Sequence, residues 1–96
     1  KFLDLLFKEE NLMDEFIRLI RTVKGVKKVL LHGPIKNNQG NIIILGTNID
    51  TLVVDNICNE IKDKGLDLSN VVLTENQYLK LDKMGVYGGD KRVLLG

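Results

Sequence analysis

Apolar residues in the first quarter of the chain recur every three or four positions. Five of them fall on one face of a helix: Leu12, Phe16, Leu19, Ile20 and Val23. This spacing predicts an amphipathic helix, and Gly25 is typical of the residue that follows a helix end. Leu3, Leu6 and Phe7 continue the pattern upstream, while Asn11 between the two stretches predicts an interruption or a new N-cap.

Two apolar runs follow, and each predicts a β-strand. The first covers residues 26–32 and is expected to stop at Gly33-Pro34, because proline cannot donate a ladder hydrogen bond. Residues 36–41 are polar and typical of a turn. The second run, 42–45, is apolar at every position, as in a central strand that is covered on both faces. We expect the two strands to pair antiparallel across the turn.

The next segment predicts a β-α-β unit. Apolar residues on one helical face predict a helix over 50–64, and residues 68–73 predict a third strand. A helix that connects two strands of one sheet makes a right-handed crossover between parallel strands. The strands at 42–45 and 68–73 are therefore expected to be parallel.

The last third of the chain predicts one more helix and one more strand. Thr74 and Gln77 have the spacing of a capping box, which predicts a short helix from there to about Met84. Residues 92–95 predict a final strand. The predicted order is α-β-β-α-β-α-β. We expect a single α/β (α+β) domain over 1–96, built as a mixed four-stranded sheet with helices packed on it.

Composition narrows the class of protein. The 96 residues are 44% hydrophobic and 28% charged, with a formal net charge of +1, so no overall field attracts nucleic acid or an acidic membrane. A single cysteine cannot form an internal disulfide, which favours a reducing, cytoplasmic compartment. No apolar run approaches the ~20 residues of a membrane span. The chain does not begin with methionine, so we expect a trimmed chain or a piece of a longer one.

Residues able to perform catalysis are few. The chain holds one serine, one histidine and one cysteine: Ser69, His32 and Cys58. No local signature pairs a nucleophile with a base, and Cys58 falls on the apolar face of the second helix, which predicts a core residue. The sequence predicts no catalytic residue, no metal and no cofactor. The sequence leaves open whether the chain is an enzyme, and its residues favour a protein that is not one.

Two segments predict a ligand site at strand ends. His32 and Gly33 close the first strand, at an edge where α/β proteins often bind ligands. The alternative for His32 is an ordinary hydrogen bond to backbone or water. The second segment joins a buried strand to a helix N-terminus, where free N–H groups attract anions; it comprises Gly46, Thr47 and Asn48.

An ordinary strand-to-helix turn is the alternative for the second segment. Asp50 is expected to cap the following helix, and its carboxylate would repel a phosphate. The glycine-rich segment 85–90 follows a helix and precedes a strand, which is opposite to a dinucleotide fingerprint. We interpret that segment as a flexible connector.

Two adjacent cations form a candidate basic patch. Lys91 and Arg92 follow Tyr87, whose ring could stack on a base, and Lys27 and Lys28 could join them. A solvated charged face is the alternative. Nucleic acid is therefore a less favoured partner.

From about Lys28 to Gly96 the chain resembles the small nucleotidyltransferase-like domains of the polymerase-β superfamily. In that family, apolar strands end in glycine, an acidic turn follows the second strand, and a strand reading Val-Val-Leu-Thr precedes a short helix. The matching segments here are Val29–Gly33, Ile42–Gly46 with Asn48–Asp50, Val71–Thr74 and Arg92–Gly96. The resemblance implies a nucleotide pocket at the strand ends.

The chain departs from the active members of that family at the residues that carry the chemistry. Active members have serine after the first glycine and an Asp-x-Asp pair ahead of the second strand. Here Pro34 follows Gly33, and Gln39 and Asn41 take the places of the aspartates. Two metal ions would lack their carboxylate ligands, so the resemblance implies a degenerate member.

Three functions remain in view. The leading hypothesis is a non-catalytic α/β module that acts through protein contacts or self-association. The first alternative is a domain that binds a small ligand or nucleotide, and the second is an RNA-binding domain. None of the three implies a membrane.

Overall fold

The computed structural model describes the backbone of residues 2–96 and the side chains of residues 11–96. Its elements are α1 (Phe2–Ile20), β1 (Val26–Lys36), β2 (Gln39–Gly46), α2 (Thr51–Asp63), β3 (Asp67–Leu73), α3 (Glu75–Lys83) and β4 (Lys91–Leu95). This order confirms the predicted α-β-β-α-β-α-β sequence of elements. In the described residues no helix is both long and apolar enough to cross a membrane.

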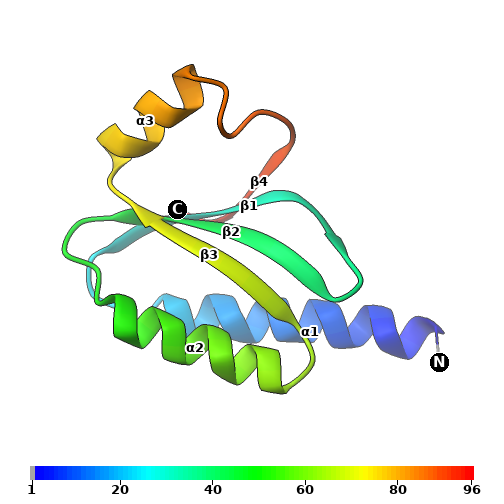
Figure 1. Ribbon diagram of the computed structural model, residues 1–96. Helices are drawn as coiled ribbons and strands as arrows, with labels where there is room; N and C mark the ends of the chain where they lie inside the picture. Colours follow the sequence, from blue (N-terminus) through cyan, green and yellow to red (C-terminus); the bar gives the residue numbers. More distant parts are fainter. Residues whose placement is uncertain (1) are drawn as a thin grey trace.

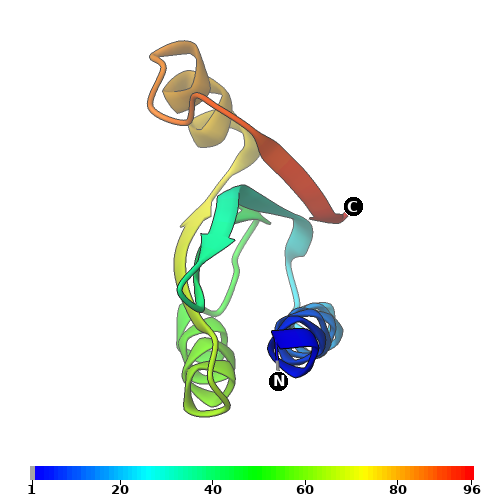
Figure 2. The same cartoon turned by 90° about the vertical axis from the view of Figure 1, so that its right-hand side faces the viewer.

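The four strands form one mixed sheet in the order β3-β2-β1-β4. β1 pairs antiparallel with β2 and with β4, whereas β2 and β3 are parallel. Both predicted pairings are therefore confirmed. α1 and α2 lie side by side on one face of the sheet, and α3 lies on the other (Figures 1 and 2). We call these the helix face and the α3 face.

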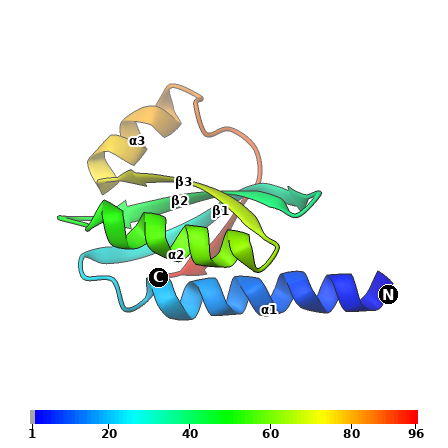
Figure 3. The ribbon, with the colours of Figure 1, turned by 60° about the horizontal axis from the view of Figure 1, so that its bottom comes forward.

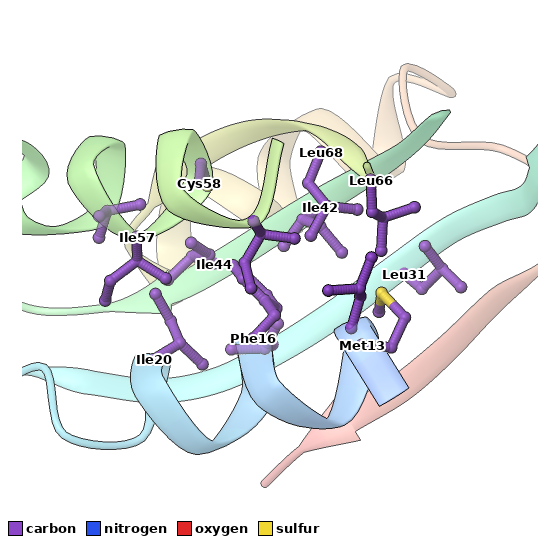
Figure 4. Close-up of a cluster of buried hydrophobic side chains, with 14 of the residues drawn as sticks. Met13, Phe16, Ile20, Leu31, Ile42, Ile44, Ile57, Cys58, Leu66 and Leu68 are labelled. Carbon is purple, nitrogen blue, oxygen red and sulfur yellow. The ribbon is translucent and has the colours of Figure 1, made fainter. Parts of the chain in front are cut away.

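The main core lies on the helix face, between the sheet and the α1–α2 layer (Figure 3). Phe16 and Ile20 of α1 meet Ile44 of β2, and all three are fully buried. Figure 4 shows these side chains together with those that α2 and β3 contribute. The predicted helical and strand faces therefore converge on one layer. Cys58 is buried in this layer, which confirms its interpretation as a core residue.

Two predicted interruptions are absent from the structure. α1 runs without interruption through Asn11, because an interior asparagine costs a helix only a few tenths of a kcal/mol relative to a good helix former. β1 continues past Gly33-Pro34 to Lys36. A register irregularity between His32 and Lys36 takes up the proline, so no regular ladder bond is needed from it.

The β1–β2 turn is shorter than the polar stretch predicted. It holds only Asn37 and Asn38, whose φ angles are 52° and 59°. Two successive residues with positive φ form a type I′ hairpin turn, and asparagine tolerates that conformation well. Both helix starts match the sequence: Asp50 caps α2, and the Thr74–Gln77 capping box begins α3.

Candidate functional site

A row of polar side chains on the α3 face runs across the sheet from strand to strand. Strand register places His32 of β1 beside Lys91 of β4 and Asn41 of β2, and Asn41 beside Ser69 of β3. Ile43 lies two residues after Asn41 and packs on the α3 face. Because strand side chains alternate between faces, the whole row points to that side.

The segment that follows α3 covers part of this row of polar side chains. His32 Nε2 donates a hydrogen bond to the Gly88 carbonyl (2.8 Å). The His32 and Tyr87 rings also make a T-shaped contact at a centroid distance of 5.8 Å, and Tyr87 stacks on Tyr78 at 5.8 Å. The connector predicted for 85–90 is therefore held against β1 by its carbonyl and its ring.

Lys91 of β4 contacts α3 on the same side of the sheet. Its ammonium group donates to the Asp82 carboxylate at 2.8 Å and lies 5.6 Å from the centre of the Tyr78 ring. The hydrogen bond to Asp82 raises the pKa of Lys91 above its usual value. The charge of Lys91 is therefore used within the fold and is not free for a distant phosphate.

A pocket of about 250 Å³ lies between Tyr87 and strands β1–β3. His32, Asn41 and Ser69 are among its polar lining residues, while Ile43 and Val71 add apolar surface. A second hollow shares Asn41 and Ser69 and continues toward the β1–β2 turn. The arrangement suits a small molecule with one apolar face and several hydrogen-bonding groups.

The same geometry does not favour nucleophilic catalysis. Ser69 and His32 lie on β3 and β1 with β2 between them. Two strand spacings separate them by about 10 Å, too far for a hydrogen bond between nucleophile and base. Among the described side chains, no three His, Cys, Asp or Glu residues gather as a metal ion would require.

The five predicted ligand residues fall into two separate groups. His32 pairs with Asn41, whereas Gly46 pairs with Val26 at the other end of the β1–β2 ladder. Five residues of strand span about 17 Å. His32 and Gly33 therefore lie near the α3-face pocket, and Gly46, Thr47 and Asn48 lie at the opposite end of the sheet.

The second group is tightly packed against the α1–β1 connection. The Thr47 N–H donates to the Gly25 carbonyl (3.0 Å), and a Cβ added to Gly46 would lie 1.9 Å from that same oxygen. Asp50 accepts hydrogen bonds from the N–H groups of Leu52 and Val53. These contacts use the donors that would otherwise face an anion, as in an ordinary strand-to-helix turn.

The two residues of the predicted basic patch point to opposite faces. Lys91 lies on the α3 face, whereas Arg92 lines a groove on the helix face. Lys28 pairs with Leu45 near the other end of β1. The structure therefore brings together neither Lys91 with Arg92 nor these residues with Lys27 and Lys28.

Sequence reasoning missed the free edge of β4. Val93 lies on the α3 face and is 53% exposed, and Leu94 and Leu95 are only partly buried. The described part of the sheet ends at β4, so no strand covers its outer side. The signal was in the sequence: three consecutive apolar residues in a strand place apolar side chains on both faces.

A groove of about 250 Å³ runs beside this edge on the helix face. Apolar residues of α1, β1 and β4 form it, among them Met13, Ile17 and Leu94. Asp14 and Arg92 are its charged residues, and neither has an ion-pair partner among the side chains from Asn11 onward. β4 and its groove are an uncovered apolar feature at a free edge of the sheet.

Comparison of the chain with protein-family models, with curated proteins and with solved structures gave no significant match.

Proposed function

We propose that the chain is a non-catalytic α/β module that acts through protein contacts made along β4. The observation that carries this proposal is that β4 lies at a free edge of the sheet, with Val93 53% exposed and Leu94 and Leu95 only partly buried. A free edge presents unpaired N–H and C=O groups that a second strand can bind. Apolar side chains beside such an edge add specificity for the strand that pairs with it.

The residues on the α3 face support a non-catalytic role. Gln39 and Asn41 lie where the resembling family has its two metal-binding aspartates, and both are neutral amides. They can donate and accept hydrogen bonds but cannot neutralise two divalent ions. We therefore propose the nucleotidyltransferase resemblance as that of a degenerate member, which keeps a similar order of strands without the chemistry.

Site-specific photo-cross-linking tests the proposed contact surface. A photoreactive residue replaces Val93 in one variant and Val86 in a matched control. The two valines are equally exposed at 53%, but Val86 lies in the connector after α3. We expect cross-linked products in cells from position 93 and none from position 86. Equal yields at the two positions, or no product from either, would contradict the proposal.

A second function is favoured by the pocket under Tyr87. His32, Asn41 and Ser69 converge there beside an aromatic ring, which supports binding of a small ligand or a nucleotide. Titration of the labelled protein with ATP, with and without Mg²⁺, tests this alternative. Amide shifts at these three residues would support it, shifts at Thr47 and Asn48 would support the other strand end, and no shifts would count against both.

A further inference from the structure

We infer that the strand bound along β4 is β4 of a second copy of the chain, paired antiparallel about a two-fold axis at Val93. This inference rests on the proposed function and names its partner. A two-fold dimer brings the same surface patch of each subunit together. The five residues Lys91–Leu95 then extend the two sheets into one. Three features of the edge fit this partner.

The first feature is the direction of the backbone groups of β4. The Gly33 N–H donates to the Asp90 carbonyl at 2.9 Å, and Leu31 and His32 lie opposite Arg92 and Lys91. Hydrogen-bonded pairs alternate along an antiparallel ladder. Arg92 therefore bonds to β1, whereas Lys91 and Val93 direct their N–H and C=O groups to the free edge. Val93 can exchange two hydrogen bonds with Val93 of the second copy.

The second feature is the charge pattern on the helix face. A two-fold axis at Val93 places Arg92 of one copy opposite Leu94 of the other. Leu94 borders the groove whose remaining charged residue is Asp14. Arg92 of each copy therefore reaches the groove of the other, where Asp14 offers an opposite charge. Neither residue has an ion-pair partner among the side chains of residues 11–96 of one chain.

The third feature is on the α3 face. Pairing brings the two Val93 side chains together and covers apolar surface that is 53% exposed in one copy. Lysine on an edge strand normally discourages pairing. Here Lys91 is held by Asp82 at 2.8 Å, so its charge is already compensated within the subunit.

The other edge of the sheet fits a second copy less well. β3 begins with Asp67, and Ser69 and Asn70 give its first half a polar character. α2 covers the helix face beside it (Figure 1), and Asn70 bonds to Cys58 of that helix. β3 therefore differs from β4 in the polar character of its first half and in the helix that covers it on the helix face.

Analytical ultracentrifugation over a range of concentrations tests the dimer. A short strand pair gives a small interface, so we expect a dimer that dissociates on dilution. Val93→Lys places two like charges at the axis and should raise the dimer dissociation constant at least tenfold. Val86→Lys makes the same change at an equally exposed valine and should leave the constant unchanged. Circular dichroism checks that both variants fold.

A charge exchange tests the register. Asp14→Arg and Arg92→Asp should each raise the dissociation constant several-fold, and the double variant should return it to within about threefold of the native value. A double variant no better than the single ones would overturn the pairing about Val93. Native protein that stays monomeric at millimolar concentration, or equal effects of Val93→Lys and Val86→Lys, would overturn the dimer.

The cross-linking experiment separates this inference from the proposed function. A product of twice the 10.8 kDa chain mass from position 93 supports both. A product with a different protein alone leaves the proposed function standing and overturns the second copy as partner. No product from position 93 overturns both.

Discussion

The two faces of the sheet differ in how much apolar surface they bury. Among the side chains of residues 11–96, the helix face gathers 15 buried residues into one cluster, whereas the α3 face gathers three: Leu30, Ile43 and Leu45. α3 itself has no buried residue. Its contact with the sheet relies on the Tyr78–Tyr87 stack, the His32–Gly88 bond and the Lys91–Asp82 pair.

This difference teaches which part of the molecule carries stability and which part is available for binding. Apolar burial is the main favourable contribution to folding, so the helix face holds the fold together. A layer joined by a few polar and aromatic contacts can open locally at a much lower free energy than global unfolding. The polar row and its pocket therefore lie beneath the layer that is easiest to move.

Adjacent isoleucines of β2 provide the sharpest test of this difference. Ile44 faces the large cluster and Ile43 the small one, and both are almost completely buried. Truncation to alanine removes the same atoms from each. We expect Ile44→Ala to cost about 4 kcal/mol and Ile43→Ala about 2 kcal/mol, because the loosely held α3 layer can close over the smaller cavity. Urea denaturation measures both values.

Conservative variants control for effects of the two positions in β2 that do not come from the size of the cavity. Ile43→Val and Ile44→Val keep the branched shape and should each cost about 1 kcal/mol. Equal losses for the two alanine variants would mean that the faces contribute alike, and the comparison would fail.

Most of the fold could be predicted because each element is encoded locally. The apolar run 42–45 predicts a strand covered on both faces, and Ile43 and Ile44 do pack on opposite clusters. The Thr74–Gln77 spacing predicts a capping box that the structure contains. The stop at Gly33-Pro34 was wrong because tertiary pairing with β2 and β4 continues beyond a locally unfavourable pair.

The candidate site could be predicted only in part. His32 was a candidate, but Asn41 and Ser69 join it through register across three strands, which no local pattern encodes. Tyr87 lies in a glycine-rich connector, and only the tertiary fold brings its ring into contact with that of His32. The separation of Gly46 from His32 likewise follows from the antiparallel pairing of their strands. Spacing along the sequence carries little of this information.

Removal of the Tyr87 ring tests how firmly α3 is attached. Tyr87→Ala loses the stack on Tyr78 and the edge contact with His32, worth about 1–2 kcal/mol together. We expect hydrogen exchange of the α3 amides to accelerate roughly tenfold, while amides of α2 change little. Tyr87→Phe keeps the ring and is the matched control. Uniform acceleration in α2 and α3 would show that the two layers open together.

Removal of either helix cap should give a smaller effect, and it tests the same difference between the two faces of the sheet. Asp50 caps α2 on the helix face, and Thr74 caps α3 on the other. Replacing either by alanine should cost its helix about 1 kcal/mol. For Asp50→Ala we expect that loss in global denaturation, since α2 unfolds with the core. For Thr74→Ala we expect the loss mainly as faster hydrogen exchange of the α3 amides. A full global loss for Thr74→Ala would contradict a separately opening layer.

The reactivity of the Cys58 thiol measures how well the core on the helix face excludes solvent and reagents. Burial is the main cause that raises the pKa of Cys58 to about 11, against the opposing effect of the Asn70 hydrogen bond. The thiolate fraction falls about tenfold for each unit of pKa. A disulfide reagent at pH 8 should therefore label the native protein about 100-fold more slowly than the unfolded chain. Equal rates would show that the layer opens freely.

The same thiol also predicts a dependence of stability on alkaline pH. The unfolded chain releases the thiol proton near pH 9, whereas the folded protein keeps it to about pH 11. Unfolding in that interval releases a proton, so the contribution is complete below pH 9 and is lost as the pH rises toward 11. Cys58→Ala is the control, because it removes the thiol and with it this part of the decline. If the native protein and the variant lose stability in parallel between pH 9 and 11, the decline has another origin, such as Lys91, whose raised pKa acts in the same direction.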